Sequence, residues 1–168
     1  MNTITTKLET GALSASSGAR RRIAFVQACW HRNIVDECRD AFLVSIQTHG
    51  YCAEDIDFYE VPGAYELPLH AQRLARSSNY AAVVAAGLIV DGGIYRHDFV
   101  ARAVIDGLMR VQLDTDTPVF SAVLTPHHFH GGAEHVDFFF KHFRVKGEEV
   151  ASACARTIEQ LTSLPIVK

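Results

Sequence analysis

Residues 80–89 constrain the fold more than any other segment of this chain. They read YAAVVAAGLI, an apolar run of strand length in which no polar residues alternate with the apolar ones. A strand with one face in water shows such alternation, so this run is typical of a strand that is covered on both faces. It therefore belongs at the centre of a sheet that has helices on both sides.

Strand-length apolar runs and segments of helical periodicity alternate along the rest of the chain. Strands are predicted at residues 23–27, 56–61 and 118–124, and helices at residues 33–48, 65–77 and 97–112, with two further helices at 134–143 and 147–161. This alternation predicts an α/β fold with right-handed crossovers. We expect a three-layer α/β/α sandwich around a mainly parallel four-stranded sheet.

The length of the chain favours a single domain. A chain of 168 residues is long enough for one full hydrophobic core and too short for two ordinary ones. Residues 1–20 are rich in Thr, Ser, Gly and Ala and contain no apolar segment like that of a secretory signal. We predict a disordered tail over residues 1–20 and one domain over residues 21–168.

Composition narrows the expected partners and the compartment. The formal net charge is −3 and no long basic run occurs, so the electrostatic source of nucleic-acid binding is missing. No apolar stretch reaches the roughly 20 residues that cross a bilayer. Neither nucleic acid nor membrane is an expected partner. The four cysteines lack a C-x-x-C pair, which favours reduced thiols and a cytoplasmic protein.

Residues 87–100, GLIVDGGIYRHDFV, carry the clearest chemical signal. Two adjacent glycines let backbone N–H groups approach an anion, and the helix that follows adds unpaired donors and a favourable dipole. Arg96 supplies a fixed positive charge and His97 a proton carrier near neutral pH. Taken alone, a turn from a strand into a helix is more often only a turn.

Three segments follow predicted strands and therefore meet at one edge of the sheet, where ligands of such folds bind. They are residues 28–31, 61–68 and 92–98. Trp30 could stack on a flat heterocycle, or it could be a core or interface aromatic. Glu66 could accept hydrogen bonds from a ligand, or it could only complement the helix dipole. A lone histidine such as His97 is also structural more often than catalytic.

Two further clusters leave alternatives open. Residues 125–132, TPHHFHGG, concentrate histidines, but no carboxylate or cysteine completes a recognised metal-ligand spacing, so a metal site is not favoured. Phe138, Phe139, Phe140 and Phe143 put more aromatic surface on one short helix than a single buried stripe requires. An oligomer interface and ordinary packing are both compatible with that surface.

Four segments in order, VPGAYELP, GLIVDGGIYRHDFV, PVFSAVLT and VKGEEVA, resemble the 6,7-dimethyl-8-ribityllumazine synthase family over about residues 22–162. The detail is most similar to the second, decamer-forming bacterial type, in which the Trp-His after the first strand also occurs. The resemblance implies a flavodoxin-like fold, and pentamers that are paired into decamers with active sites shared between adjacent subunits.

The resemblance also implies the reaction. The family condenses 5-amino-6-ribitylaminouracil with 3,4-dihydroxy-2-butanone 4-phosphate to give 6,7-dimethyl-8-ribityllumazine in riboflavin biosynthesis, through an imine, loss of phosphate and ring closure. No redox cofactor and no metal is implied. The alternative is a flavin- or lumazine-binding protein that has the same pocket but little catalytic turnover.

Site residues carried over by position fall into three groups. Trp30 matches the aromatic that stacks on the pyrimidine. Gly93 and Ile94 match the phosphate-binding amides. The remaining substrate-binding positions are Ala64, Tyr65 and Glu66 for the ribityl chain, Leu88, Ile89 and Val90 for the uracil edge, and Ser121, where the usual enzyme has an aromatic from a neighbouring subunit.

The chain departs from the family pattern at two catalytic positions. Arg96 stands where the family has its proton-transferring histidine, and arginine is a poor base because its pKa exceeds about 12. Either His97 serves as the base, or Arg96 acts only through its charge. The family's phosphate-binding arginine also lacks a clean counterpart, for which Arg144, His135 and His127 are the candidates.

Overall fold

The computed structural model describes residues 22–94, 96–129 and 132–165 of the chain. Four strands form one sheet: β1 (Arg22–Ala28), β2 (Ile56–Val61), β3 (Tyr80–Leu88) and β4 (Val119–Leu124). Their order across the sheet is β2-β1-β3-β4, and every neighbouring pair is parallel. The predicted α/β fold with a parallel four-stranded sheet is confirmed. The predicted tail lies outside the described residues.

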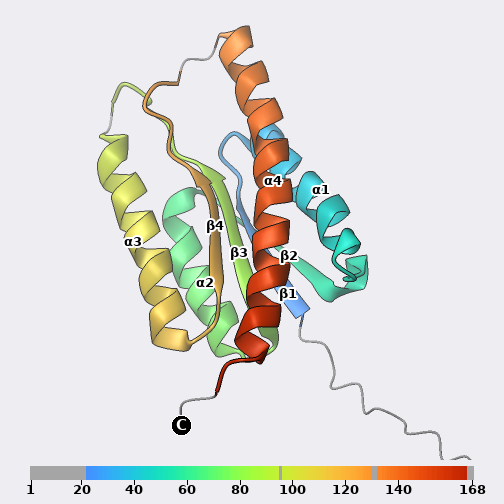
Figure 1. The fold of residues 1–168 in the computed structure, drawn as a ribbon. Coiled ribbons are helices and arrows are strands. Elements are labelled where there is room, and N and C mark those ends of the chain that lie inside the picture. The colour runs from blue at the N-terminus through green and yellow to red at the C-terminus, as the bar shows by residue number, and fades with distance from the viewer. Residues whose placement is uncertain (1–21, 95, 130–131, 166–168) are drawn as a thin grey trace, which may run out of the picture.

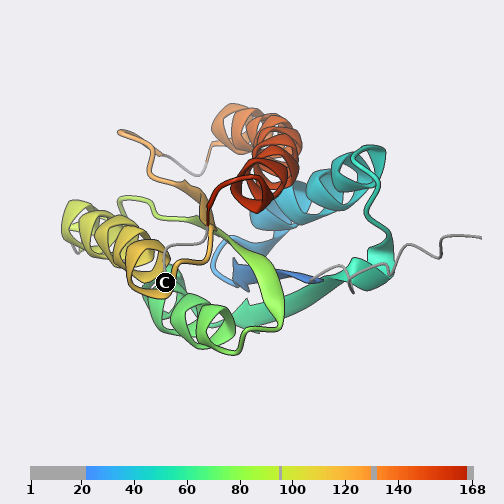
Figure 2. The same ribbon diagram turned by 60° about the horizontal axis from the view of Figure 1, so that its bottom comes forward.

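Helices cover both faces of the sheet, as Figures 1 and 2 show. Helices α1 (Arg32–Thr48) and α4 (Ala133–Thr162) pack side by side on one face, and α2 (Leu67–Arg76) and α3 (His97–Thr115) pack together on the other. Two short 3₁₀ helices, η1 (Ala53–Asp55) and η2 (Ala64–Glu66), join these elements. No helix in the described part of the chain has the length and apolar character of a membrane span.

The core consists of two apolar clusters, one on each face of the sheet. Ile23 and Phe25 of β1 belong to the cluster under α1 and α4, whereas Ala24 and Val26 belong to the cluster under α2 and α3. Successive side chains of a strand point to opposite faces, so β1 contributes to both clusters. In β3, every residue except the half-buried Ala81 is buried. The prediction that residues 80–89 contain a central strand is therefore confirmed.

The prediction of two separate carboxyl-terminal helices is wrong, because α4 is one continuous helix from Ala133 to Thr162. Gly147 lies in its middle and is buried. A Cβ atom built on Gly147 would lie 2.4 Å from the carbonyl oxygen of Cys38 and 2.9 Å from the backbone nitrogen of Phe42, both in α1. Gly147 is therefore a point of close contact between α4 and α1 and does not end the helix.

The phenylalanines of α4 serve mainly in packing. Phe139 and Phe143 are buried in the core, and Phe140 is half-buried against it. Phe138 alone of the four is exposed, with 58% of its surface accessible, and its ring stacks on that of His142 at a centroid distance of 5.7 Å. Three of the four rings thus take part in ordinary packing of the core, whereas the ring of Phe138 is available for a contact at the surface.

Candidate functional site

The candidate site lies where β1, β2 and β3 end, at one edge of the parallel sheet. Backbone hydrogen bonds continue the sheet just beyond the strands: the N–H of Cys29 donates to the carbonyl of Val61 at 2.9 Å, and the N–H of Ile89 donates to that of Leu124 at 2.9 Å. The loops that follow the strands therefore leave the sheet at fixed positions. This geometry brings the predicted loop segments to the same edge.

Trp30, Gly63 and Glu66 come together at this edge. The N–H of Gly63 donates to Oε2 of Glu66 at 2.9 Å, which orients the carboxylate. A Cβ atom built on Gly63 would lie 3.2 Å from that oxygen and 3.8 Å from the indole of Trp30. Indole and carboxylate thus lie over the same glycine. Trp30 is nevertheless 72% exposed, so much of the indole surface remains accessible to a planar ligand.

A second glycine brings η2 close to the sheet. Gly87 belongs to β3, and a Cβ atom built there would lie 3.2 Å from the Cβ of Ala28, 3.7 Å from that of Ala64 and 3.5 Å from Cδ1 of Leu67. Because Gly87 has no side chain, η2 and the start of α2 pack directly on β1 and β3. Helix η2 also contacts α3, so the segment 64–66 lies between the first strand and the helix that begins with His97.

The glycine turn after β3 is open to solvent. Gly93 has a φ of +74°, a left-handed conformation that favours glycine. A Cβ atom built on Gly92 or on Gly93 would meet no atom within 4 Å. The N–H of Gly93 donates to Oδ1 of Asp91 at 2.9 Å. A phosphate that binds to this amide must therefore replace the carboxylate of Asp91 as its acceptor.

At the start of α3, Arg96 is already paired. Its guanidinium forms an ion pair with Asp98 at 2.9 Å and lies 4.2 Å from the ring centre of Phe99. The hydrogen bond from Arg96 lowers the pKa of Asp98, as do the positive charge of Arg96 and nearby backbone N–H groups. His97, the first residue of α3, is half-buried. The imidazole of His97 thus lies at the start of α3, next to a guanidinium whose positive charge is offset by Asp98.

The other predicted binding residues differ in how exposed they are. Leu88, Ile89 and Ala64 are buried, which leaves mainly their backbone groups for recognition. Tyr65 and Ile94 are 69% and 82% exposed. Val90 is half-buried, whereas Ser121 is exposed on β4, and its Oγ accepts a hydrogen bond from the N–H of Val123 at 3.3 Å.

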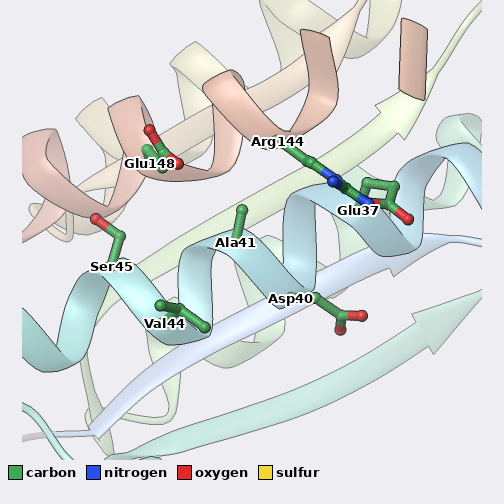
Figure 3. A pocket seen from close by; sticks show the side chains of 7 residues that line it. All are labelled: Glu37, Asp40, Ala41, Val44, Ser45, Arg144 and Glu148. Carbon is green, nitrogen blue, oxygen red and sulfur yellow. The ribbon is translucent and has the colours of Figure 1, made fainter. Parts of the chain in front are cut away.

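Of the candidates for the missing phosphate-binding arginine, Arg144 is engaged between two helices. Arg144 reaches from α4 to Glu37 of α1, and that hydrogen bond and charge raise the pKa of the guanidinium. Figure 3 shows this pair in a cleft of about 550 Å³ between the two helices, lined also by Asp40, Val44 and Glu148. The remaining lining residues are Ala41 and Ser45.

The two histidine candidates lie close to the end of β4. His135, in the first turn of α4, is half-buried with its ring 6.3 Å from Phe129 and 6.0 Å from Phe139. His127 is exposed in the loop before α4. Among the described residues no group of three or more His, Cys, Asp or Glu side chains could hold a metal ion; His130 of the histidine-rich loop lies outside them.

Sequence reasoning missed one contact at this edge. The ring of His31 lies edge-on to the ring of Phe129 with a centroid distance of 5.3 Å. His31 belongs to the turn between β1 and α1, and Phe129 to the loop between β4 and α4. The segment WH after the first strand is visible in the sequence, but nothing periodic in the loop at 125–132 indicates which residue would reach it.

Comparison with known proteins identifies the family to which the chain is similar. A family model described as 6,7-dimethyl-8-ribityllumazine synthase matches residues 20–162. A protein of Rhodococcus erythropolis with that name is 66% identical over 86% of this chain and 94% of its own length. Two proteins named 6,7-dimethyl-8-ribityllumazine synthase 2 are also similar. That of Pseudomonas syringae pv. tomato is 55% identical over 89% of this chain and 88% of its own length. That of Bradyrhizobium diazoefficiens is 57% identical over 86% of each.

Proposed function

This chain belongs to the 6,7-dimethyl-8-ribityllumazine synthase family, and we propose that it condenses 5-amino-6-ribitylaminouracil with 3,4-dihydroxy-2-butanone 4-phosphate to give 6,7-dimethyl-8-ribityllumazine. One observation carries the proposal beyond family membership. The exposed indole of Trp30 and the oriented carboxylate of Glu66 lie over Gly63 at the edge of the sheet. A flat ring with polar substituents fits these two groups, because one offers a π face and the other offers acceptors.

The pyrimidine would be held from two sides. Trp30 stacks on its ring, and the backbone of Leu88, Ile89 and Val90 faces its polar edge. The ribityl hydroxyls donate to Glu66, whose other contact is with the backbone of Gly63. Because η2 packs directly on β1 and β3, Glu66 and the backbone of Leu88 are held by the sheet before the substrate arrives, which limits the entropy lost on binding.

The butanone phosphate would bind at the glycine turn. The amides of Gly93 and Ile94 take the phosphate, and the positive end of α3 adds to the attraction. His97 transfers the proton, because arginine keeps its own proton at any ordinary pH. Arg96 contributes a positive charge, which its pairing with Asp98 partly offsets.

Orientation supplies much of the rate enhancement in this scheme. The amine of one substrate attacks the carbonyl of the other to give an imine and a first water, phosphate is then eliminated, and the ring closes with loss of a second water. None of these steps requires a nucleophilic side chain. Holding two reactants in contact can lower a barrier by several kcal/mol, up to roughly 7–11 kcal/mol in favourable intramolecular reactions. The chain's own residues then need only to place the substrates and move protons.

We propose further that the chain forms homo-pentamers that pair into decamers, and that the protein is cytoplasmic. Exposed apolar surface at the site supports the first point, since Trp30, Tyr65, Ile94 and Phe99 are each more than 60% accessible in the single chain. A neighbouring subunit would cover them and complete the site. Four free cysteines support a reducing compartment.

One assay tests the proposed reaction. Purified full-length protein is mixed with both substrates, and release of inorganic phosphate is followed beside fluorescence of the lumazine, with the uncatalysed reaction as control. Equal rates of phosphate release and lumazine formation, both above the control, are expected. Tight binding of lumazine or flavin without turnover would instead support a ligand-binding protein, the alternative that the family assignment does not favour.

A further inference from the structure

His31 has an unusual backbone conformation next to the candidate stacking residue. Its φ of 53° and ψ of 39° place it in the left-handed region, which residues other than glycine rarely occupy. Its carbonyl accepts hydrogen bonds from the N–H groups of Ile34 and Val35, at 2.9 and 3.1 Å, at the start of α1. The conformation is therefore fixed by the helix, and it turns the chain sharply immediately after Trp30.

The side chain of His31 is held by a ring from a distant part of the chain. Phe129 meets it edge-on, with a centroid distance of 5.3 Å and an interplanar angle of 63°. Phe129 in turn lies 5.4 Å from the ring of Phe139, which is buried in the core under α1 and α4. A continuous line of ring contacts thus runs from the core to the turn that bears Trp30.

Trp30 itself is 72% exposed, and its indole lies beside Gly63, where an added Cβ atom would come within 3.8 Å of it. An exposed side chain samples several rotamers unless neighbouring groups restrict it. The left-handed residue that follows Trp30 is held through its carbonyl by the start of α1 and through its ring by Phe129, and both contacts restrict the turn that carries the indole.

We propose that Phe129 and His31 form a latch that positions the indole of Trp30 over Gly63 for stacking on the pyrimidine. In this role Phe129 is a positioning residue, since it acts through His31 and not by touching the substrate. The proposal deepens the proposed function and rests on it for the identity of the stacked ring. The effect of the latch on Trp30 is testable without any substrate.

The test uses the full-length protein and its single tryptophan. Phe129→Leu removes the ring and keeps apolar volume, Phe129→Tyr keeps the ring, and His31→Gly removes the imidazole while tolerating the left-handed backbone. Phe138→Leu is the matched control, because Phe138 is an exposed ring of the same region that stacks on His142. Trp30 emission, its quenching by acrylamide, kcat and the KM for the pyrimidine are measured for each, together with oligomeric mass.

The latch predicts a defined pattern. Phe129→Leu and His31→Gly should shift Trp30 emission and raise the KM for the pyrimidine about tenfold, part of the loss that removing a stacked ring causes, while kcat changes less than about threefold. Phe129→Tyr and Phe138→Leu should match the wild type. The Trp30→Ala variant gives the upper limit of the KM effect.

Two results would overturn the latch: unchanged emission and KM in both Phe129→Leu and His31→Gly, or an equal change in Phe138→Leu. If Phe129→Leu does not fold, His31→Gly and Phe129→Tyr still decide the question. Failure of the proposed function has a different signature, because then no variant makes product but Trp30 emission still responds to the latch variants. Failure of the latch leaves product formation intact with unresponsive emission.

Discussion

Arg96 and His97 are adjacent in the chain but differ in whether they can serve as the catalytic base. Arg96 is committed to Asp98 and to the face of Phe99, whereas His97 carries an imidazole, the side chain used most often for proton transfer in catalysis. We expect His97→Ala to lower kcat about 100-fold, within the range of general acid–base catalysis. Oligomeric mass and thermal stability should change little, because the helix persists.

The comparison variant for this prediction is Arg96→Gln, which removes the positive charge and leaves the imidazole. If His97 is the base, Arg96→Gln should affect kcat less than His97→Ala does. A larger effect of Arg96→Gln, with His97→Ala close to wild type, would assign the chemistry to electrostatic stabilisation by Arg96. Steady-state rates and the pH profile of kcat for both variants decide between these roles.

Asp91 is a negative group at the turn proposed to bind phosphate. Its Oδ1 accepts from the N–H of Gly93 at 2.9 Å, so it competes with the ligand for a donor and also repels it. Asp91→Asn keeps an acceptor oxygen and removes the charge. Like charges about 4 Å apart in water repel by about 1 kcal/mol, so the KM for the butanone phosphate should fall about fivefold. Weaker binding in the Asn variant, measured at low salt, would contradict this role.

At the scale of elements, Gly147 sets the distance between α4 and α1. A methyl group there would collide with the backbone of Cys38 and Phe42, which cannot move aside as a flexible side chain would. We expect Gly147→Ala to lower the free energy of unfolding by about 1–3 kcal/mol, despite the gain in helix propensity. Gly107→Ala in α3 is the comparison variant and should be less destabilising, since its methyl group would meet the ring of Pro68 at 3.0 Å and not backbone atoms at 2.4–2.9 Å. Urea unfolding of both variants tests the difference.

The same two helices bury thiols. Burial raises the pKa of Cys38 and Cys154 from 9.0 to about 12. The folded state therefore keeps these protons when the unfolded state has lost them, so the stabilisation is full below pH 9 and is lost as the pH rises toward 12. Between pH 9 and pH 12, each thiol should lower the free energy of unfolding by up to about 1.4 kcal/mol per pH unit. The difference in the free energy of unfolding between wild type and Cys154→Ala should therefore become smaller from pH 9 to pH 10.5. A difference that stays constant over this range would contradict the prediction.

Periodicity predicted the four strands and the helices α1, α2 and α3, because apolar spacing is dictated by which face each element buries. The strand predicted at residues 23–27 is β1 (Arg22–Ala28), and the helix predicted at residues 33–48 is α1 (Arg32–Thr48). The break placed before Gly147 was wrong for a physical reason. Glycine ends helices and also permits close helix contact, and only the position of the partner helix distinguishes the two.

For the site, the rule that parallel strands end at one edge predicted that Trp30 and Glu66 would lie near each other, and they meet over Gly63. The contact between His31 and Phe129 could not be predicted, because the path of an irregular loop has no period. The roles of His97 and of the phosphate-binding candidates stay predictions. Arg144 in particular pairs with Glu37 of the same chain.

At the scale of the whole molecule, the described residues expose apolar surface at the candidate site and also along α3. The α3 surface is a stripe formed by Ile105, Met109 and Leu113, which are 37%, 53% and 73% exposed. These residues follow at intervals of four, so they lie on one face of the helix. Contiguous apolar surface of this kind is typical of an interface between proteins. We therefore expect light scattering to give a mass that is a multiple of 18.6 kDa.

A variant that assembles less well should then also lose specific activity. Met109→Lys places a charge in the middle of the α3 stripe, where it would be buried without a partner if subunits meet there. We expect this variant to shift to smaller species and to lose specific activity on dilution at concentrations where the wild type keeps both, while its circular dichroism remains that of a folded chain. Arg110→Gln, at the neighbouring exposed position of α3, should behave as the wild type. Full activity in a monomeric Met109→Lys protein would show that one chain completes the site alone, because a shared site cannot survive separation of its subunits.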